Sequence, residues 1–131
     1  MSTPLQDQPF PGARSRGAAA YRAIDVDHAN PIRLTAAATR GAAVEAGRAL
    51  AALRAADDSA CGEAISRASN LIGVLREGLD LARGEELARN LDQVYVYLQM
   101  RLLRANISRD SGLLEEVRNH LTGLAEVWES I

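Results

Sequence analysis

The stretch NLDQVYVYLQMRLLRANISRDSGLLEEVRNHLTGLAEVW, residues 90–128, decides the fold class of this chain. Large apolar residues recur through it every three or four positions, the spacing that places them on one face of an α-helix. The first such stripe begins just upstream at Leu87 and continues with Leu91, Val94, Leu98 and Leu102, and the second is Leu114, Val117, Leu121, Leu124 and Trp128. Residues 106–111, between the stripes, are rich in turn-forming side chains. The stretch therefore predicts two amphipathic helices joined by a tight turn, with Asp110 or Ser111 capping the second.

Upstream, the sequence predicts a first helix over residues 31–56. Asn30 is a good N-cap, and Pro31 suits the first helical position because the N–H that it lacks has no partner inside a helix. The large apolar residues of this helix are few, namely Ile32, Leu34, Val44, Leu50 and Leu53. Alanine and glycine must fill the rest of its inner face, so a neighbouring helix or peptide is expected to approach closely.

A second helix is predicted after the polar break at residues 57–59, capped by Asp58 or Ser59. Its apolar positions at helical spacing are Ile65, Ala68, Leu71 or Ile72, Leu75 and Leu79. Arg83 and Gly84 are expected to end it, since glycine readily takes the left-handed conformation that follows a helix. The third helix is then expected from about Glu85 to Ala105.

Four amphipathic helices with short links predict an all-α fold, an antiparallel up-down four-helix bundle. The composition agrees, because alanine is abundant, aromatic residues make up 4%, and all four prolines lie within the first 31 residues. We expect one domain over residues 18–131, in which residues 18–24 form a short N-terminal cap segment. Residues 1–17 contain three of the prolines and two glycines, and they are expected to form a disordered tail.

Charge and cysteine content exclude several classes of protein. The 15 basic residues are all arginine, and they are spread along the chain beside 17 acidic residues, so no basic stripe for nucleic acid emerges. The single cysteine, Cys61, cannot form an internal disulfide. The N-terminus lacks a signal-peptide pattern, and no apolar run approaches the roughly 18 to 20 residues that span a bilayer. We expect a cytoplasmic protein without stable membrane insertion.

Candidate catalytic or metal-binding groups are sparse. His28 lies near Asp25 and Asp27, an arrangement that could bind a divalent cation but is more typical of a solvated helix-entry loop. Glu116 and His120 share a helix face, yet the paired Glu-x-x-His motifs of di-iron bundles are missing. Cys61 begins a helix without a histidine nearby in sequence. We therefore expect no enzyme activity, no cofactor and no metal, while a small metal- or redox-active bundle enzyme is kept as an alternative.

The two tyrosines of the third helix cannot share a face, because residues two apart lie about 200° apart around a helix. If one of Tyr95 and Tyr97 lies in the core, the other points largely outward. The simplest interpretation packs Tyr95 and leaves Tyr97 at the boundary. The alternative assigns the outward tyrosine to a binding surface, where tyrosine is enriched.

The segment from Asn90 to Val117 resembles the flagellar secretion chaperone family, FliS. The matching residues are Asn90, Leu91, Tyr95, Tyr97, Leu98, Arg101, Leu102, Ala105, Asn106, Asp110 and the run from Leu114 to Val117, with Trp128 as the family's late tryptophan. Upstream, Tyr21 matches the family's N-terminal tyrosine, and Asn30, Pro31, Leu34, Thr35 and Gly41 match the start of its first helix. The resemblance covers about residues 21–131.

The resemblance implies a four-helix-bundle export chaperone in the bacterial cytosol. Its partners would be the C-terminal region of flagellin, which it would protect from premature polymerisation and degradation, and a component of the membrane export gate of the flagellar type III apparatus. The expected client-binding residues are Tyr21, Ile24, Leu34, Ala38, Ile72, Leu75, Leu79, Leu91, Tyr95 and Tyr97, and the structural signature residues are Asn30, Pro31, Arg101, Asn106, Asp110 and Trp128. The turn chemistry lets Asn106 satisfy terminal carbonyls of the third helix.

Three points of this interpretation have alternatives, namely the shape of the client groove, the kind of protein and the role of the N-terminal segment. The family usually fills its first helix with large apolar residues where this chain has small ones over residues 36–41, which implies a shallower client groove or one tuned to a different flagellin. A generic helical interaction or dimerisation module, including a homodimer, is also compatible with the pattern. For the N-terminal segment, we expect Tyr21 to dock in part of the groove and leave when the client arrives, with a permanently packed short helix as the alternative.

Overall fold

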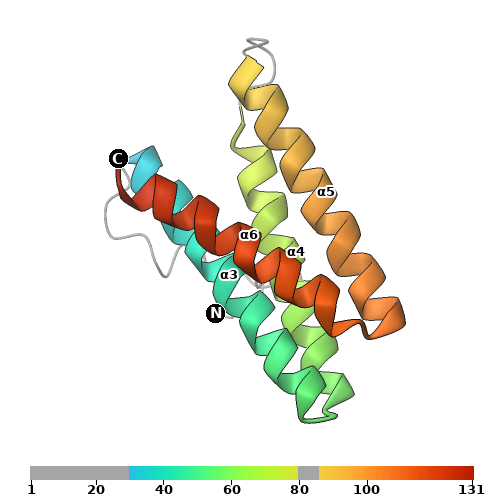
Figure 1. The fold of residues 1–131 in the computed structure, drawn as a ribbon. Coiled ribbons are helices and arrows are strands. Elements are labelled where there is room, and N and C mark those ends of the chain that lie inside the picture. Colours follow the sequence, from blue (N-terminus) through green and yellow to red (C-terminus); the bar gives the residue numbers. More distant parts are fainter. Residues whose placement is uncertain (1–29, 80–85) are drawn as a thin grey trace, which may run out of the picture.

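The computed structural model describes residues 30–79 and 86–131, which form four helices. They are α3 (Pro31–Arg54), α4 (Asp58–Glu77), α5 (Glu86–Ser108) and α6 (Ser111–Glu129), and each runs antiparallel to the one before it (Figure 1). In this part of the chain the predicted all-α fold is confirmed. The predicted tail and the cap segment with Tyr21 and Ile24 lie outside the described residues.

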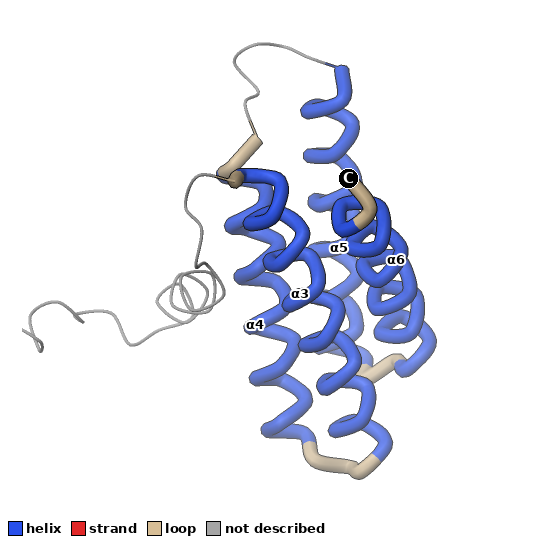
Figure 2. The backbone as a smooth tube through the Cα atoms, turned by 90° about the vertical axis from the view of Figure 1, so that its left-hand side faces the viewer, coloured by secondary structure: helices blue, strands red, loops and turns tan. Residues whose placement is uncertain are grey.

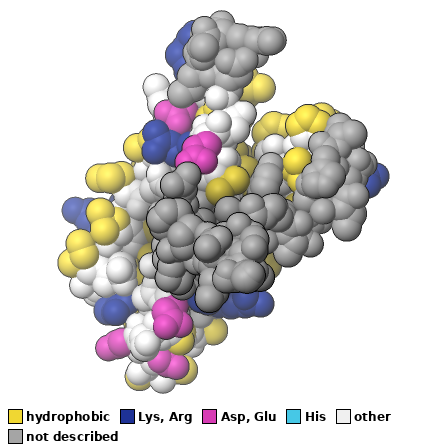
Figure 3. Space-filling model, turned by 180° about the vertical axis from the view of Figure 1, so that it is seen from behind, with side chains coloured by type: hydrophobic (Ala, Val, Ile, Leu, Met, Phe, Trp, Pro, Cys, Tyr) yellow, Lys and Arg dark blue, Asp and Glu magenta, His cyan; other side chains and the backbone are white. Residues whose placement is uncertain are grey.

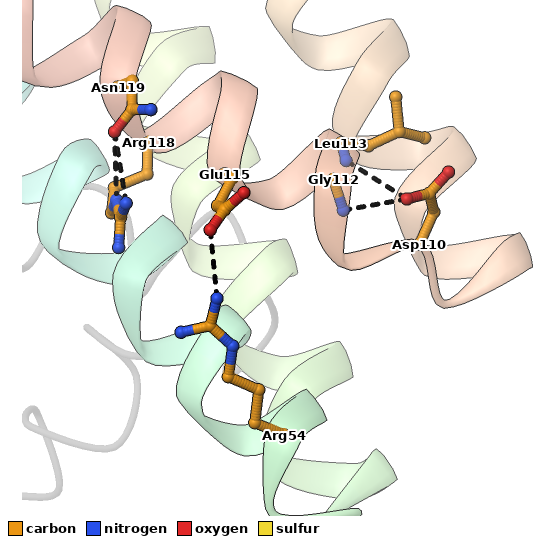
Figure 4. A network of polar contacts seen from close by, with 7 residues as sticks. All are labelled: Arg54, Asp110, Gly112, Leu113, Glu115, Arg118 and Asn119. Atoms are coloured by element: carbon orange, nitrogen blue, oxygen red, sulfur yellow. Dashed lines mark hydrogen bonds and ion pairs between the residues drawn. The ribbon is translucent and has the colours of Figure 1, made fainter.

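Local capping explains where three of the helices begin. The Asn30 side chain accepts a hydrogen bond from the backbone N–H of Arg33 (3.1 Å) and Pro31 follows at the first position, as predicted. Asp110 caps α6 by accepting from the N–H groups of Gly112 and Leu113, at 2.8 and 3.4 Å (Figure 4). These bonds satisfy donors that would otherwise lack partners in a first helical turn.

The predicted cap of α4 is wrong. Asp57, not Asp58 or Ser59, is the N-cap, and its carboxylate accepts from the N–H of Ala60 (3.1 Å). The reason is that Ala56, in the left-handed conformation with φ 58°, reverses the chain one residue before it. The helix itself ends at Glu77, followed by Gly78 and Leu79, and so stops well before the predicted Arg83.

The turn between α5 and α6 is shorter than predicted. Helix α5 continues to Ser108, so that only Arg109, at φ 54°, and Asp110 connect the helices. The predicted role of Asn106 at the helix terminus is not what the contacts show. The Arg109 N–H donates to the Ala105 carbonyl (2.8 Å) and the Ser108 hydroxyl to that of Arg104 (2.9 Å), which leaves the Asn106 side-chain oxygen to accept from the Arg109 guanidinium (2.9 Å).

The core is built on an inner face of α3 that consists mostly of alanine. Six buried alanines line it, namely Ala36, Ala38, Ala42, Ala43, Ala46 and Ala49, as the sequence predicted. Because alanine is small, α3 lies close to α4 on one side and to α6 on the other (Figure 2). Helix α5 packs less closely on α4 and α6. An ion pair between Arg54 and Glu115 (3.0 Å) adds a polar tie between α3 and α6 (Figure 4).

The apolar stripe of α5 departs from the prediction at one end. Leu87 is 65% exposed, and the buried residues of this helix are Ala88, Tyr95, Leu98, Leu102 and Ala105. Figures 1 and 2 show why, since the first turns of α5 project beyond the start of α3 and the end of α6. The stripe therefore extends past the helices that would cover it, and the bundle is open at that end.

Candidate functional site

An apolar groove lies at the open end of the bundle, where α3 and α5 begin and α4 and α6 end. Its cavity volume is about 250 Å³. The lining residues are Pro31, Ile32, Thr35, Val74, Leu75, Gly78, Leu79, Leu91, Tyr95 and Trp128. None of them carries a charge, so the groove is suited to an apolar segment of a polypeptide or to another apolar ligand. We call this surface the end groove.

The pair of aromatic side chains in the end groove links α5 to α6. Tyr95 is buried, and this burial raises the pKa of its hydroxyl, while a hydrogen bond with Trp128 acts in the opposite direction. The Trp128 side chain itself remains half-buried and lines the groove. The late tryptophan thus joins the fold to the candidate site, although the sequence suggested only a structural role for it.

The structure brings four of the ten expected client-binding residues together in the end groove, namely Leu75, Leu79, Leu91 and Tyr95. Ala38 and Ile72 have no exposed surface and lie in the core, so in this conformation they support the helices instead of lining the groove. Leu34 is half-buried and is not part of the lining, and Tyr97 points outward from α5. This arrangement confirms the predicted division of the tyrosines, with Tyr95 in the core.

Sequence reasoning missed Ile32, Thr35 and Val74 as lining residues. The signal that could have found them is topological. In an up-down bundle, the first turns of the first and third helices meet the last turns of the second and fourth at the same end. Apolar residues in those four terminal turns are therefore the ones that this topology predicts to line a groove.

Tyr97 belongs to a polar cluster that joins α5 to α6. Its hydroxyl donates to Glu116, and the Arg101 guanidinium donates to the same carboxylate at 2.8 and 3.1 Å. Arg101 also lies over the Tyr97 ring, 5.2 Å from its centroid. The hydrogen bonds from Tyr97 and then Arg101 lower the pKa of Glu116, and the bond to Glu116 raises the pKa of Tyr97. The cluster gives the signature residue Arg101 a structural role.

A second hollow, of about 630 Å³, adjoins the end groove on the side where α3 meets α6. The two share Ile32 and Trp128, and the second also contains Ile131, so the apolar surface continues around the end of the bundle. This hollow is more polar than the end groove, because Asn30, Arg33 and Glu129 line it. Glu129 also accepts two hydrogen bonds from Arg40, at 2.8 and 3.0 Å. Seen from behind, hydrophobic side chains reach the surface in several separate patches (Figure 3).

The described residues do not assemble a reactive centre. They contain no group of three or more His, Cys, Asp or Glu side chains that could hold a metal ion. Cys61 is buried with the Arg109 guanidinium 3.6 Å from its sulfur, and His120 is exposed; His28 lies outside the described residues. None of the helices described is long and apolar enough to cross a membrane. What this arrangement offers is an apolar binding surface.

Comparisons with known proteins identify the family of this chain. The model of the family described as "Flagellar protein FliS" matches residues 14–131. The flagellar secretion chaperone FliS of Salmonella typhimurium is 38% identical over 120 residues, which are 88% of this chain and 89% of the relative. FliSB of Pseudomonas aeruginosa is 40% identical over 106 residues (81% and 84%), and FliS of Bacillus subtilis is 31% identical over 110 residues (84% and 81%). The family model matches nearly the whole length of this chain, which folds as a helical bundle with an uncharged groove. The chain therefore belongs to the FliS family of flagellar secretion chaperones.

Proposed function

We propose that this chain is a cytosolic export chaperone that binds the C-terminal region of flagellin in the end groove. Binding would keep that region from polymerising before export and hold it ready for the membrane export gate. The observation that carries the proposal is the uncharged lining of the groove, contributed by all four described helices. Membership of a family of flagellar secretion chaperones supports a flagellar protein as the client.

The proposed mechanism is recognition of a helix in a groove, coupled to folding of the client. A disordered segment with apolar residues at helical spacing would order as its side chains enter the space between Leu79, Leu91 and Ile32. No covalent step is required, because the gain is the removal of apolar surface from water. Tyr95 and Trp128 line the groove, and Tyr95 is buried, so that client selection would follow the size of the side chains inserted against them.

The small residues of α3 bear less on this groove than the sequence suggested. The lining residues of α3 are Pro31, Ile32 and Thr35, all of which precede the stretch at residues 36–41. Within that stretch, Ala38 and Thr39 are buried in the bundle. We therefore propose that the stretch sets how closely α3 packs, and that client preference is set by the residues at the ends of the helices.

The proposed displaceable cap is compatible with the chain path at the groove. Pro31 lines the groove, so the chain preceding Asn30 starts at its rim. A Tyr21 segment tethered there by the short stretch at residues 25–30 would compete with the client at high effective concentration. Removal of that segment provides the test.

The proposed function is tested by titrating the full chain with a synthetic peptide of the flagellin C-terminal region in a calorimeter. Leu91→Ser, in the end groove, is expected to weaken binding roughly tenfold or more, as loss of a central apolar anchor does. Ile107→Ser is the matched control, because Ile107 lies on the same helix, is exposed and faces away from the groove. Leu79→Ser, just beyond the last turn of α4, serves as a second variant should Leu91→Ser unfold.

The outcomes separate this function from a generic helical module. A peptide of the same composition in shuffled order should not bind, because its apolar residues no longer share a face. Equal binding of the native and shuffled peptides would favour the generic module. Absence of binding by the unmodified chain would refute flagellin as the client.

A further inference from the structure

A second apolar surface runs along the outer face of α5. Val96, Met100, Leu103 and Ile107 are separated by four, three and four residues, so they share one face of the helix. Their side chains are 36%, 60%, 54% and 77% exposed. Tyr95, Leu98 and Leu102, which face the core, lie on the opposite side of the same helix. We call the four exposed residues the outer stripe.

The outer stripe borders a hollow of about 570 Å³ with a basic edge. Its described lining consists of Met100, Arg101, Leu103, Arg104, Ile107 and Ser108. Arg101 is paired with Glu116, whereas the Arg104 guanidinium makes no hydrogen bond or ion pair with another described residue. The described part of the lining therefore has two guanidinium groups and no carboxylate, and Arg104 is available to a ligand.

The charge of the outer stripe separates its ligand from that of the end groove. The end groove is lined without any charge, while the apolar residues of the outer stripe stand beside Arg101 and Arg104. Leu91 and Tyr95 reach the end groove from the inner side of α5, so a ligand on the outer stripe leaves that groove open. Two surfaces of different chemistry on opposite sides of one helix are suited to two different ligands at once.

The size of the outer stripe argues against a second copy of this chain. From Val96 to Ile107 it extends about 16 Å, or three helical turns. A stable protein dimer buries about 800 Å² on each partner, which one face of a three-turn helix does not supply, whereas a smaller area suffices for a transient complex with a second protein. An antiparallel pair centred on the stripe would also place the Arg104 side chains of both copies on the same side of the contact, where like charges repel.

We propose that the outer stripe is a docking surface for an acidic amphipathic helix of a second protein, three to four turns long, bound while the end groove holds a client. Apolar side chains of that helix would lie along Met100, Leu103 and Ile107. Its carboxylates would pair with Arg104. The identity of the client in the end groove is not needed for this proposal.

The experiment measures binding of two helix-stapled fluorescent peptides of about 16 residues to the full chain by anisotropy. Both carry leucine at positions i, i+4, i+7 and i+11; one has glutamate on its flanks and the other has lysine. The acidic peptide should bind, more weakly as salt is raised, and the basic peptide should not. Arg104→Glu should reverse the preference, and the double variant Leu103→Ser with Ile107→Ser should weaken the acidic peptide roughly tenfold. Leu91→Ser, in the end groove, is the matched control and should leave this binding unchanged.

Each other occupant of the surface gives a distinct result that overturns the proposal. Equal affinity for both peptides would mean an apolar surface without charge selection. Concentration-dependent dimers in sedimentation, abolished by Leu103→Glu, would assign the stripe to a second copy. A photo-crosslinker at position 103 of the purified chain that captures residues 1–29 of the same molecule would assign it to the N-terminal segment. Competition between the acidic peptide and a bound flagellin peptide would place both on one site. If the flagellin peptide does not bind the chain at all, the comparison of the acidic and basic peptides still tests the outer stripe.

Discussion

Leu102 and Leu103 are adjacent, identical residues on α5 whose substitution should have opposite consequences. Leu102 has 0% of its surface exposed, whereas Leu103 is 54% exposed on the outer stripe. Replacing a fully buried leucine with alanine removes apolar contacts and leaves a cavity, which costs about 2–5 kcal/mol. Total stability is about 5–15 kcal/mol for a domain, so Leu102→Ala removes a large part of it. Leu103→Ala should change the free energy of unfolding by less than about 0.5 kcal/mol.

The pair is measured by urea unfolding and by thermal melting, both followed by far-UV circular dichroism. Each kcal/mol lowers Tm by about 3–6 °C for a domain of this size, so Leu102→Ala should melt roughly 5–30 °C below Leu103→Ala. Because both variants carry the same change in the same helix, helix propensity cancels between them. Equal midpoints, or a larger loss for Leu103→Ala, would refute the assignment of the inner and outer faces of α5.

Four further predictions follow from the site and the sequence. Client binding should bury on the order of 1,000–3,000 Å² with a gain of helix, so calorimetry at several temperatures should show a clearly negative heat-capacity change; a value near zero with no gain of helicity in circular dichroism would contradict coupled folding. The combined variant Cys61→Ala, His28→Gln and His120→Gln should bind a flagellin peptide normally in the same titration, because apolar contacts need none of these groups; loss of bound metal together with loss of function would revive an enzyme. Removing residues 1–24 should tighten binding of the same peptide and increase the fluorescence of a hydrophobic dye, since a competing cap lowers the competent fraction; weaker binding by a well-folded truncation would show that the segment supports the site. The hydrogen bonds from Tyr97 and Arg101 hold the pKa of Glu116 below its ordinary value of 4.5, so their stabilising contribution is present above that pH and is lost as pH falls through the lowered value; melts of Glu116→Gln should be less pH-dependent in that range, and an unchanged dependence would show that the cluster adds nothing.

Features set by a few neighbouring residues could be predicted from the sequence, while features set by how far helices overlap could not. The N-cap at Asn30 and the cap at Asp110 are chemical signals confined to one turn. Leu79 and Leu87 continue the apolar spacing of their helices, which predicts the face on which they lie. Their exposure depends on where the other helices end, and the spacing of residues along one helix does not predict that.

The candidate site shows the same division. Helical geometry separated Tyr95 from Tyr97, and the structure places Tyr95 in the core. Ala38 and Ile72 share helices with groove residues but are covered by neighbouring helices, a property of the packed bundle and not of either helix alone. Trp128 was assigned to the fold because it ends an apolar stripe, yet the end of a stripe is also where a bundle opens.

The alanine face of α3 has a consequence for how this chaperone can evolve. With Ala38, Ala42, Ala46 and Ala49 fully buried against closely packed neighbours, nearly every substitution there adds volume to a filled space and costs stability. Heritable change in client preference is therefore excluded from the middle of α3 and must accumulate in the terminal turns and on α5. A lineage that acquires a different client would be expected to keep this helix as a constant frame while its open end diverges.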